Sequence, residues 1–135
     1  MEGFPEEGWV SEDVRADFPT LGLLHLTVEL AGPRDSKLLK RRMGDLERYF
    51  NGTAITQLRT RPVVAAHRVF FRQVGLDPDV DLLPVEEALR GRLMQGRFES
   101  HGLLADALTI TAIETEVPVM ALDGRAVLGP LGVST

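Results

Sequence analysis

The chain has 135 residues, enough for one domain, and its 44% hydrophobic and 26% charged residues are typical of a globular protein rather than a disordered or fibrous one. The absence of cysteine excludes disulfides, thiolate nucleophiles and cysteine zinc sites. The acidic N-terminus lacks the pattern of a signal peptide, and no apolar run approaches the roughly 20 residues that span a membrane. We therefore expect a single cytoplasmic domain over residues 1–135, with no membrane partner.

The net charge of −5 is unevenly distributed along the chain. Residues 1–33 hold seven acids and one base (−6), residues 34–97 hold thirteen bases and eight acids (+5), and residues 98–135 hold one base and five acids (−4). The basic middle segment is suited to binding phosphate groups. A solvated helical surface remains the alternative explanation.

The N-terminal part of the chain is predicted to be extended. Residues 1–19 are polar and acidic and form a lead-in with a short turn at residues 11–16. Residues 21–30 are rich in leucine and valine, with Thr27 and Glu29 at alternating positions. This alternation predicts a strand packed on one face.

Three amphipathic helices are predicted in the middle of the chain. Apolar residues recur there at spacings of three and four, and a capping residue or a proline begins each segment. The expected helices run from a cap at Asp35 or Ser36 to Phe50, from Pro62 to Gly75, and from Pro84 to Gly96. The residues expected to face the core are Leu39, Met43, Leu46 and Phe50, then Val63, Ala66, Phe70 and Val74, then Val85, Ala88, Leu89 and Leu93.

A fourth predicted helix, residues 102–115, is apolar on nearly every side, which is typical of a buried central helix. Residues 118–122 are predicted to form a buried strand, followed by a turn at Asp123–Gly124 and a short apolar run at residues 126–128. A strand, then helices, then strands indicates an α+β domain.

The common nucleotide, hydrolase and metal-binding motifs are absent, so we predict neither cofactor nor metal. Among the histidines, His101 is the best candidate for function. It lies in a polar loop directly before the fourth helix, and a helix N-terminus favours anionic ligands. His25 and His67 are more readily explained as hydrogen-bonded structural residues.

An ordered series of short motifs extends from Arg59 to Asp123. It comprises Arg61-Pro62, His67-Arg68, Phe71-Arg72, Gly75-Leu76-Asp77-Pro78, Glu86-Glu87-Ala88-Leu89, then Arg92 and Gly96, Leu103-Leu104-Ala105-Asp106, and Pro118 followed by Asp123. In order and spacing this series resembles the tRNA-editing (B3/4) domain of bacterial phenylalanyl-tRNA synthetase beta subunits and its free-standing relatives.

The resemblance implies a fold and a function. It implies a single α+β domain whose buried central helix packs on a mixed sheet, shortened at the C-terminus relative to the family, so that a homodimer is one way to complete the sheet. It also implies hydrolysis, in trans, of tyrosine wrongly esterified to the phenylalanine tRNA, with tRNA as the partner. The positioned water of that reaction needs no covalent nucleophile.

The resemblance further implies roles for individual residues. The glutamate that recognises the tyrosine hydroxyl falls on Glu114, four residues before Pro118. The expected catalytic residues are His101 and Asp106, the substrate-binding residues are Glu114, Thr109 and His67, and the RNA-binding residues are Arg61, Arg68, Arg72 and Arg92.

Three positions depart from the family pattern, since Thr109, Ala112 and Glu116 stand where asparagine, serine and glycine are usual. The alternative is therefore a non-catalytic module that keeps the fold and binds a small ligand or a protein. On that alternative Asp106 is a structural carboxylate and Glu114 a surface residue.

Overall fold

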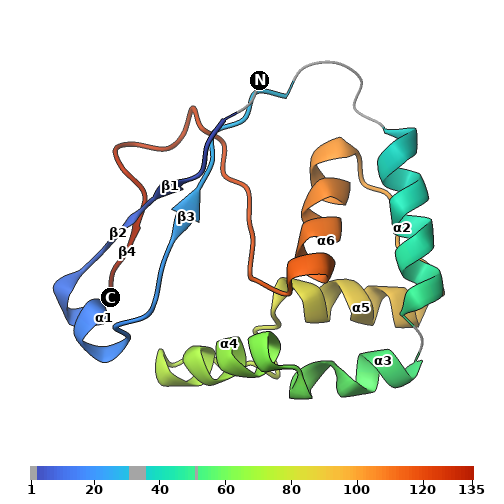
Figure 1. The fold of residues 1–135 in the computed structure, drawn as a ribbon, viewed down its shortest axis with the longest axis horizontal. Coiled ribbons are helices and arrows are strands. Elements are labelled where there is room, and N and C mark those ends of the chain that lie inside the picture. The colour runs from blue at the N-terminus through green and yellow to red at the C-terminus, as the bar shows by residue number, and fades with distance from the viewer. Residues whose placement is uncertain (1–2, 31–35, 51) are drawn as a thin grey trace. The chain divides into compact units, whose positions relative to one another are not determined.

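The computed structural model describes residues 3–30, 36–50 and 52–135 (Figure 1). Within them the chain is a mostly helical α+β protein with six α-helices and two small two-stranded sheets, which confirms the predicted class. None of the helices in this part of the chain has the length and apolar character needed to cross a membrane. The elements are β1 (Glu6–Glu7), β2 (Trp9–Val10), α1 (Glu12–Asp17), β3 (Leu24–His25), α2 (Lys37–Tyr49), α3 (Gly52–Gln57), the 3-10 helix η1 (Leu58–Thr60), α4 (Pro62–Gln73), α5 (Pro84–Gln95), α6 (Leu103–Thr115) and β4 (Gly132–Val133).

The chain divides into two compact units, of which unit 1 combines Met1–Gly32 with Leu122–Thr135 and unit 2 is Pro33–Ala121. Unit 1 contains both sheets. Strand β1 pairs antiparallel with β3, and β2 pairs parallel with β4. The indole Nε1 of Trp9 donates to the carbonyl of Pro130 at 3.1 Å, which fastens the C-terminal segment to the N-terminal strand.

The strand predictions for unit 1 were too long. The strand expected over residues 21–30 forms only at Leu24–His25. Among the described residues, strand β1 pairs only with these two residues, and beside them the Gly8 amide donates to the Leu23 carbonyl at 2.8 Å. The expected strand at residues 118–122 is wrong, since no ladder among the described residues includes it.

Unit 2 is a helical assembly with its own hydrophobic core. The core residues are Met43, Leu58, Val64, Leu83, Val85, Leu89, Phe98, Ile110 and Ile113. The prediction that the apolar central helix packs on a mixed sheet was wrong, because α6 packs against the helices α2 and α5 instead (Figure 1). Both described sheets belong to unit 1, and α6 buries Ile110 and Ile113 in the helical core while Leu104 is exposed.

The four predicted helices of unit 2 are confirmed, with local sequence signals at their ends. Ser36 caps α2 by accepting from the Leu39 amide at 3.3 Å, whereas the alternative cap Asp35 lies outside the described residues. Pro62 and Pro84 occupy the first positions of α4 and α5. Gly96 ends α5 with a left-handed φ of 76°, a conformation that glycine adopts without strain.

The buried face of α4 differs from the prediction. Val64 and Arg68 are buried, whereas Ala66 and Val74, which were expected in the core, are exposed. The reason is an ionic one, because the Arg68 guanidinium lies inside unit 2 among carboxylates from the following loop and from α5. Leu93 of α5, also expected in the core, is 59% exposed.

Candidate functional site

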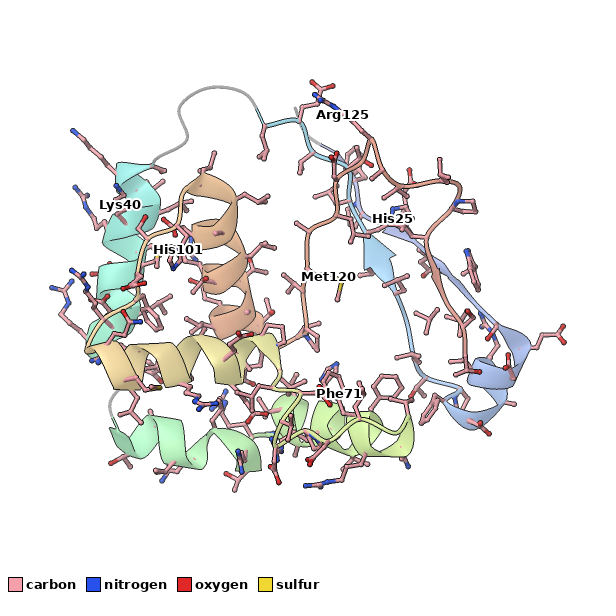
Figure 2. The ribbon with its side chains drawn as sticks, turned by 180° about the vertical axis from the view of Figure 1, so that it is seen from behind. His25, Lys40, Phe71, His101, Met120 and Arg125 are labelled. Atoms are coloured by element: carbon pink, nitrogen blue, oxygen red, sulfur yellow. The ribbon has the colours of Figure 1, made fainter. Side chains whose placement is uncertain are left out.

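A surface pocket of about 360 Å³ lies in unit 2 between α5, the loop that follows it, and α6. Arg92 and Glu87 line it from α5, Arg97, Glu99 and His101 from the loop, and Thr109 from α6. Figure 2 labels His101 on the loop that leads into α6. The pocket therefore brings together three residues that the sequence singled out, namely Arg92, His101 and Thr109.

Local structure explains why the pocket is open. Gly91 lies in the middle of α5 and lines the pocket, and a Cβ atom built on it would meet nothing within 4 Å. Because Gly91 has no side chain, the space that a side chain would fill belongs to the pocket. The loop beside it is anchored by Phe98, whose ring lies in the core and whose amide donates to Glu47 Oε1 at 2.6 Å.

Asp106, predicted to be catalytic, lies in the first turn of α6 and is 2% exposed. Its carboxylate accepts from Ser100 Oγ at 2.6 Å and from the His101 amide at 2.9 Å. Because both oxygens are engaged by the loop and little surface is accessible, Asp106 holds the loop in place. The structure makes it a positioning residue for His101.

His101 itself is accessible to solvent, with 67% of its side chain exposed. Its Nε2 atom lies 3.6 Å from Glu99 Oε2, close enough for an ion pair when the imidazole is protonated but too far for a direct hydrogen bond. An imidazole beside a carboxylate can accept and return a proton, which is the chemistry of a general base.

The charges around the pocket are mixed. Arg92 and Arg97 supply two positive charges, and Glu87 and Glu99 supply two negative ones. Arg92 Nη2 donates to the Glu47 carbonyl at 3.1 Å, while its buried Nε makes no hydrogen bond to any described residue. The pocket is therefore suited to a ligand that carries both an anionic and a cationic group.

Two predicted substrate-binding residues lie outside this pocket. Glu114, near the end of α6, accepts two hydrogen bonds of 2.7 Å from Arg42, and this bidentate pair links α6 to α2. The Nδ1 atom of His67 is 2.8 Å from the Val63 carbonyl one turn earlier in α4. The first contact joins two helices and the second lies within one helix. Neither Glu114 nor His67 lines the pocket.

The arginines predicted to bind RNA have three different environments. Arg61 forms an ion pair with Glu116, which is buried and left-handed, with a φ of 62°. Arg68, only 6% exposed, donates to Glu86 at 2.8 Å and also bonds Asp79. Arg72 is exposed and has no ion pair within the described residues. Of the four predicted arginines, only Arg92 lines the pocket.

The buried network around Arg68 perturbs two ionisable groups. The hydrogen bond from Arg68 holds the pKa of Asp79 below its ordinary value, helped by the charges of Arg68, Arg59 and Arg72. Burial lowers the pKa of the Arg68 guanidinium, but hydrogen bonds to Glu86 and Asp79 outweigh that effect and raise it overall. The Arg68–Glu86 pair of this network joins α4 to α5.

The sequence analysis missed Glu87, Gly91, Arg97 and Glu99 as pocket residues. A signal for Gly91 was present, because a glycine inside a strong helical pattern costs stability and needs an explanation. The three charged residues gave no separate signal, since charges on helix faces and in loops are common.

Comparisons of the chain with protein-family models, with curated proteins and with solved structures found no match. Within the described residues, no group of three histidine, aspartate or glutamate side chains is arranged to hold a metal ion.

Proposed function

We propose that this chain is an editing-like domain that receives the acylated 3′ end of a tRNA, with tyrosine on the phenylalanine tRNA as the type substrate. The observation that carries the proposal is the convergence of Arg92, His101 and Thr109 on one pocket. Arg92 was selected from the motif series, His101 from the loop before α6, and Thr109 as the position where the family usually has asparagine.

The chemistry of the pocket supports this ligand. An aminoacyl ester carries a protonated amino group, and the nucleotide to which it is attached carries phosphate. Glu87 and Glu99 are suited to the amino group, and Arg92 and Arg97 are suited to the phosphate. Thr109 supplies a hydroxyl that can donate to or accept from the ligand.

Hydrolysis needs a water molecule that attacks the ester carbonyl. In the proposed step His101 accepts a proton from that water as the new carbon–oxygen bond forms. The bond to the ribose oxygen then breaks, and His101 returns the proton to that oxygen. The products are the free amino acid and the deacylated tRNA, with no net change in the protein. Asp106 acts on this step only through the loop that it holds.

A second candidate function, binding without hydrolysis, is favoured by one observation. Both carboxylates that the resemblance made functional, Asp106 and Glu114, are engaged by other protein groups. The second candidate keeps the same pocket and the same ligand but leaves the ester intact.

The test is deacylation of tyrosine from the phenylalanine tRNA by the purified protein, by His101→Ala and by Glu114→Ala. The proposed hydrolase releases tyrosine above the buffer rate, and we expect His101→Ala to reduce the rate about 100-fold or more, the scale of a lost general base. Glu114→Ala serves as the matched control because its side chain lies outside the pocket. Binding of the charged tRNA without release would favour the second candidate, and neither binding nor release would refute both.

A further inference from the structure

Helix α2 carries the positive charge excess of unit 2. Its thirteen residues hold five bases and two acids (+3), whereas the rest of Pro33–Ala121 holds eight bases and ten acids (−2). The five bases are Lys37, Lys40, Arg41, Arg42 and Arg48. Figure 2 shows nitrogen-tipped side chains on the side of α2 that faces away from α6, with Lys40 labelled.

Part of this charge is aligned along the helix. Lys37, Arg41, Gly44 and Arg48 follow one another at steps of four, three and four, so they share one face, which we name the α2 basic stripe. Lys37 and Arg41 are exposed and form no ion pair within the described residues. Arg48 pairs only with Asp45 in solvent, and such a pair is weak enough to exchange for a phosphate.

Gly44 is an independent observation on the same stripe. A glycine inside a helix costs about 1 kcal/mol relative to alanine, so it usually has a packing or functional reason. Packing does not explain this one, because a Cβ atom built on Gly44 would meet nothing within 4 Å. The glycine lies between the two exposed bases and Arg48, where a bound backbone could approach the helix closely.

We propose that the α2 basic stripe is a docking surface for the sugar-phosphate backbone of a nucleic acid. The inference deepens the proposed function and rests on it for the identity of that nucleic acid, a tRNA whose acylated end enters the pocket. Charge complementarity argues for the occupant, since a regular row of phosphates matches a row of exposed bases along a helix.

A membrane surface fits the stripe less well. A helix that binds a bilayer inserts its apolar face among the lipids. The apolar face of α2 is already used, because Met43 is buried in the core and Leu39, Leu46 and Phe50 pack against that core. The exposed apolar residues of α2, Leu38 and Tyr49, lie near its opposite ends, so the helix has no continuous apolar face to insert.

The test measures binding of unacylated tRNA over a range of salt concentrations. We expect the double variant Lys37→Glu/Arg41→Glu to bind at least about ten-fold more weakly and to lower the salt slope by about one per lost phosphate contact. Arg15→Glu/Arg125→Glu is the matched control, because it reverses the same number of charges at two exposed arginines of unit 1 that form no ion pair within the described residues. Equal losses of tRNA affinity in Lys37→Glu/Arg41→Glu and in the control variant would overturn the proposal. No loss of affinity in Lys37→Glu/Arg41→Glu would overturn it as well.

Gly44→Gln separates docking from folding. A better helix former at this position, where a Cβ atom meets nothing within 4 Å, should raise the melting temperature, while its side chain blocks the approach and weakens tRNA binding several-fold. A more stable protein with unchanged tRNA affinity would contradict the role of the glycine. Tighter binding to phosphatidylserine vesicles than to tRNA, lost in the double variant, would assign the stripe to a membrane and overturn the proposal.

These results are distinguishable from a failure of the proposed function. Unacylated tRNA that binds through the stripe, together with no effect of pocket variants on any charged tRNA, would retain the docking surface and reject the pocket's role. The reverse pattern would retain the pocket and reject the stripe.

Discussion

Arg68 of α4 has a different environment from Arg41 of α2 and Arg92 of α5, although all three lie in amphipathic helices of similar sequence pattern. Arg68 of α4 is buried among Glu86 and Asp79 and stabilises the fold. Arg41 of α2 is exposed and has no ion pair within the described residues, and Arg92 lines a pocket. The difference teaches that an arginine's role here depends on whether a carboxylate from another segment lies within reach. The number of residues between an arginine and a carboxylate does not predict whether the two side chains meet.

The largest effect is expected where the arginine is buried. Arg68→Ala leaves the buried Glu86 carboxylate without its hydrogen-bonded partner and with only the partly exposed Arg59, 3.4 Å away, as an ion-pair partner, so we expect a loss of up to about 3–5 kcal/mol of unfolding free energy. Arg72→Ala, on the exposed side of the same helix, should change it by less than about 0.5 kcal/mol. Urea unfolding of both variants measures the contrast, and equal losses would break the comparison.

A paired replacement sharpens the same point. If the cost of Arg68→Ala comes from the unpaired carboxylate, Arg68→Met combined with Glu86→Leu should unfold closer to the wild-type protein than either single variant does. Additive losses in the double variant would show that packing of the arginine stem, rather than charge pairing, accounts for the stability.

A smaller effect is expected at Asp106. Asp106→Ala leaves the Ser100 hydroxyl and the His101 amide without their acceptor, which costs about 1–3 kcal/mol. Amide hydrogen exchange at His101 should accelerate at the same time, because the loop loses its anchor. Asp106→Asn keeps one acceptor oxygen, so its loss of stability and its faster exchange at His101 should both be smaller. Unchanged exchange at His101 in Asp106→Ala would contradict the role of Asp106 in holding the loop.

Replacing the glycines inside helices with alanine should raise the stability of the protein rather than lower it. Gly91→Ala and Gly44→Ala each add a methyl group in open space, so each should raise the unfolding free energy by up to about 1 kcal/mol. Thermal unfolding measures this directly. A loss of stability in either variant would mean that packing explains that glycine after all.

The smallest effect concerns the pH dependence of stability. The pKa of Asp79 is lowered in the folded protein, so its contribution is fully present above its ordinary value of 3.8 and is lost as pH falls from there through the folded value. Asp79→Asn should therefore lose less stability than the wild-type protein between about pH 5 and pH 2. If the stability of the two proteins fell equally as the pH was lowered, the contact between Asp79 and Arg68 would not exist in solution.

The sequence predicted α2, α4, α5 and α6 because their signals are local, and it missed α3 and the 3-10 helix η1. Ser36, Pro62, Pro84 and Gly96 fix helix ends through their own capping or backbone preferences. The predicted sheet failed because a strand needs a partner from elsewhere in the chain, and residues 118–122 find none. Burial on α4 failed for a similar reason, since Glu86 and Asp79, which draw Arg68 inward, lie in later segments.

The candidate site was predictable only in part. His101 was identifiable from its loop and its place before α6, which are local features. The companions Glu87, Gly91, Arg97 and Glu99 became visible only when α5 and α6 were placed side by side. Glu114 was assigned by position in a motif, yet Arg42 occupies both of its oxygens.

The central claim, that the pocket between α5 and α6 receives an aminoacyl end, is tested most directly with a stable amide analogue of tyrosyl-adenosine. Calorimetry would compare its binding to the wild-type protein and to Gly91→Leu, whose added side chain fills the pocket from a position with nothing else within 4 Å. We predict binding to the wild-type protein and its loss in a Gly91→Leu variant that melts no lower. Equal affinity in the two proteins, or no binding to either, would contradict the account.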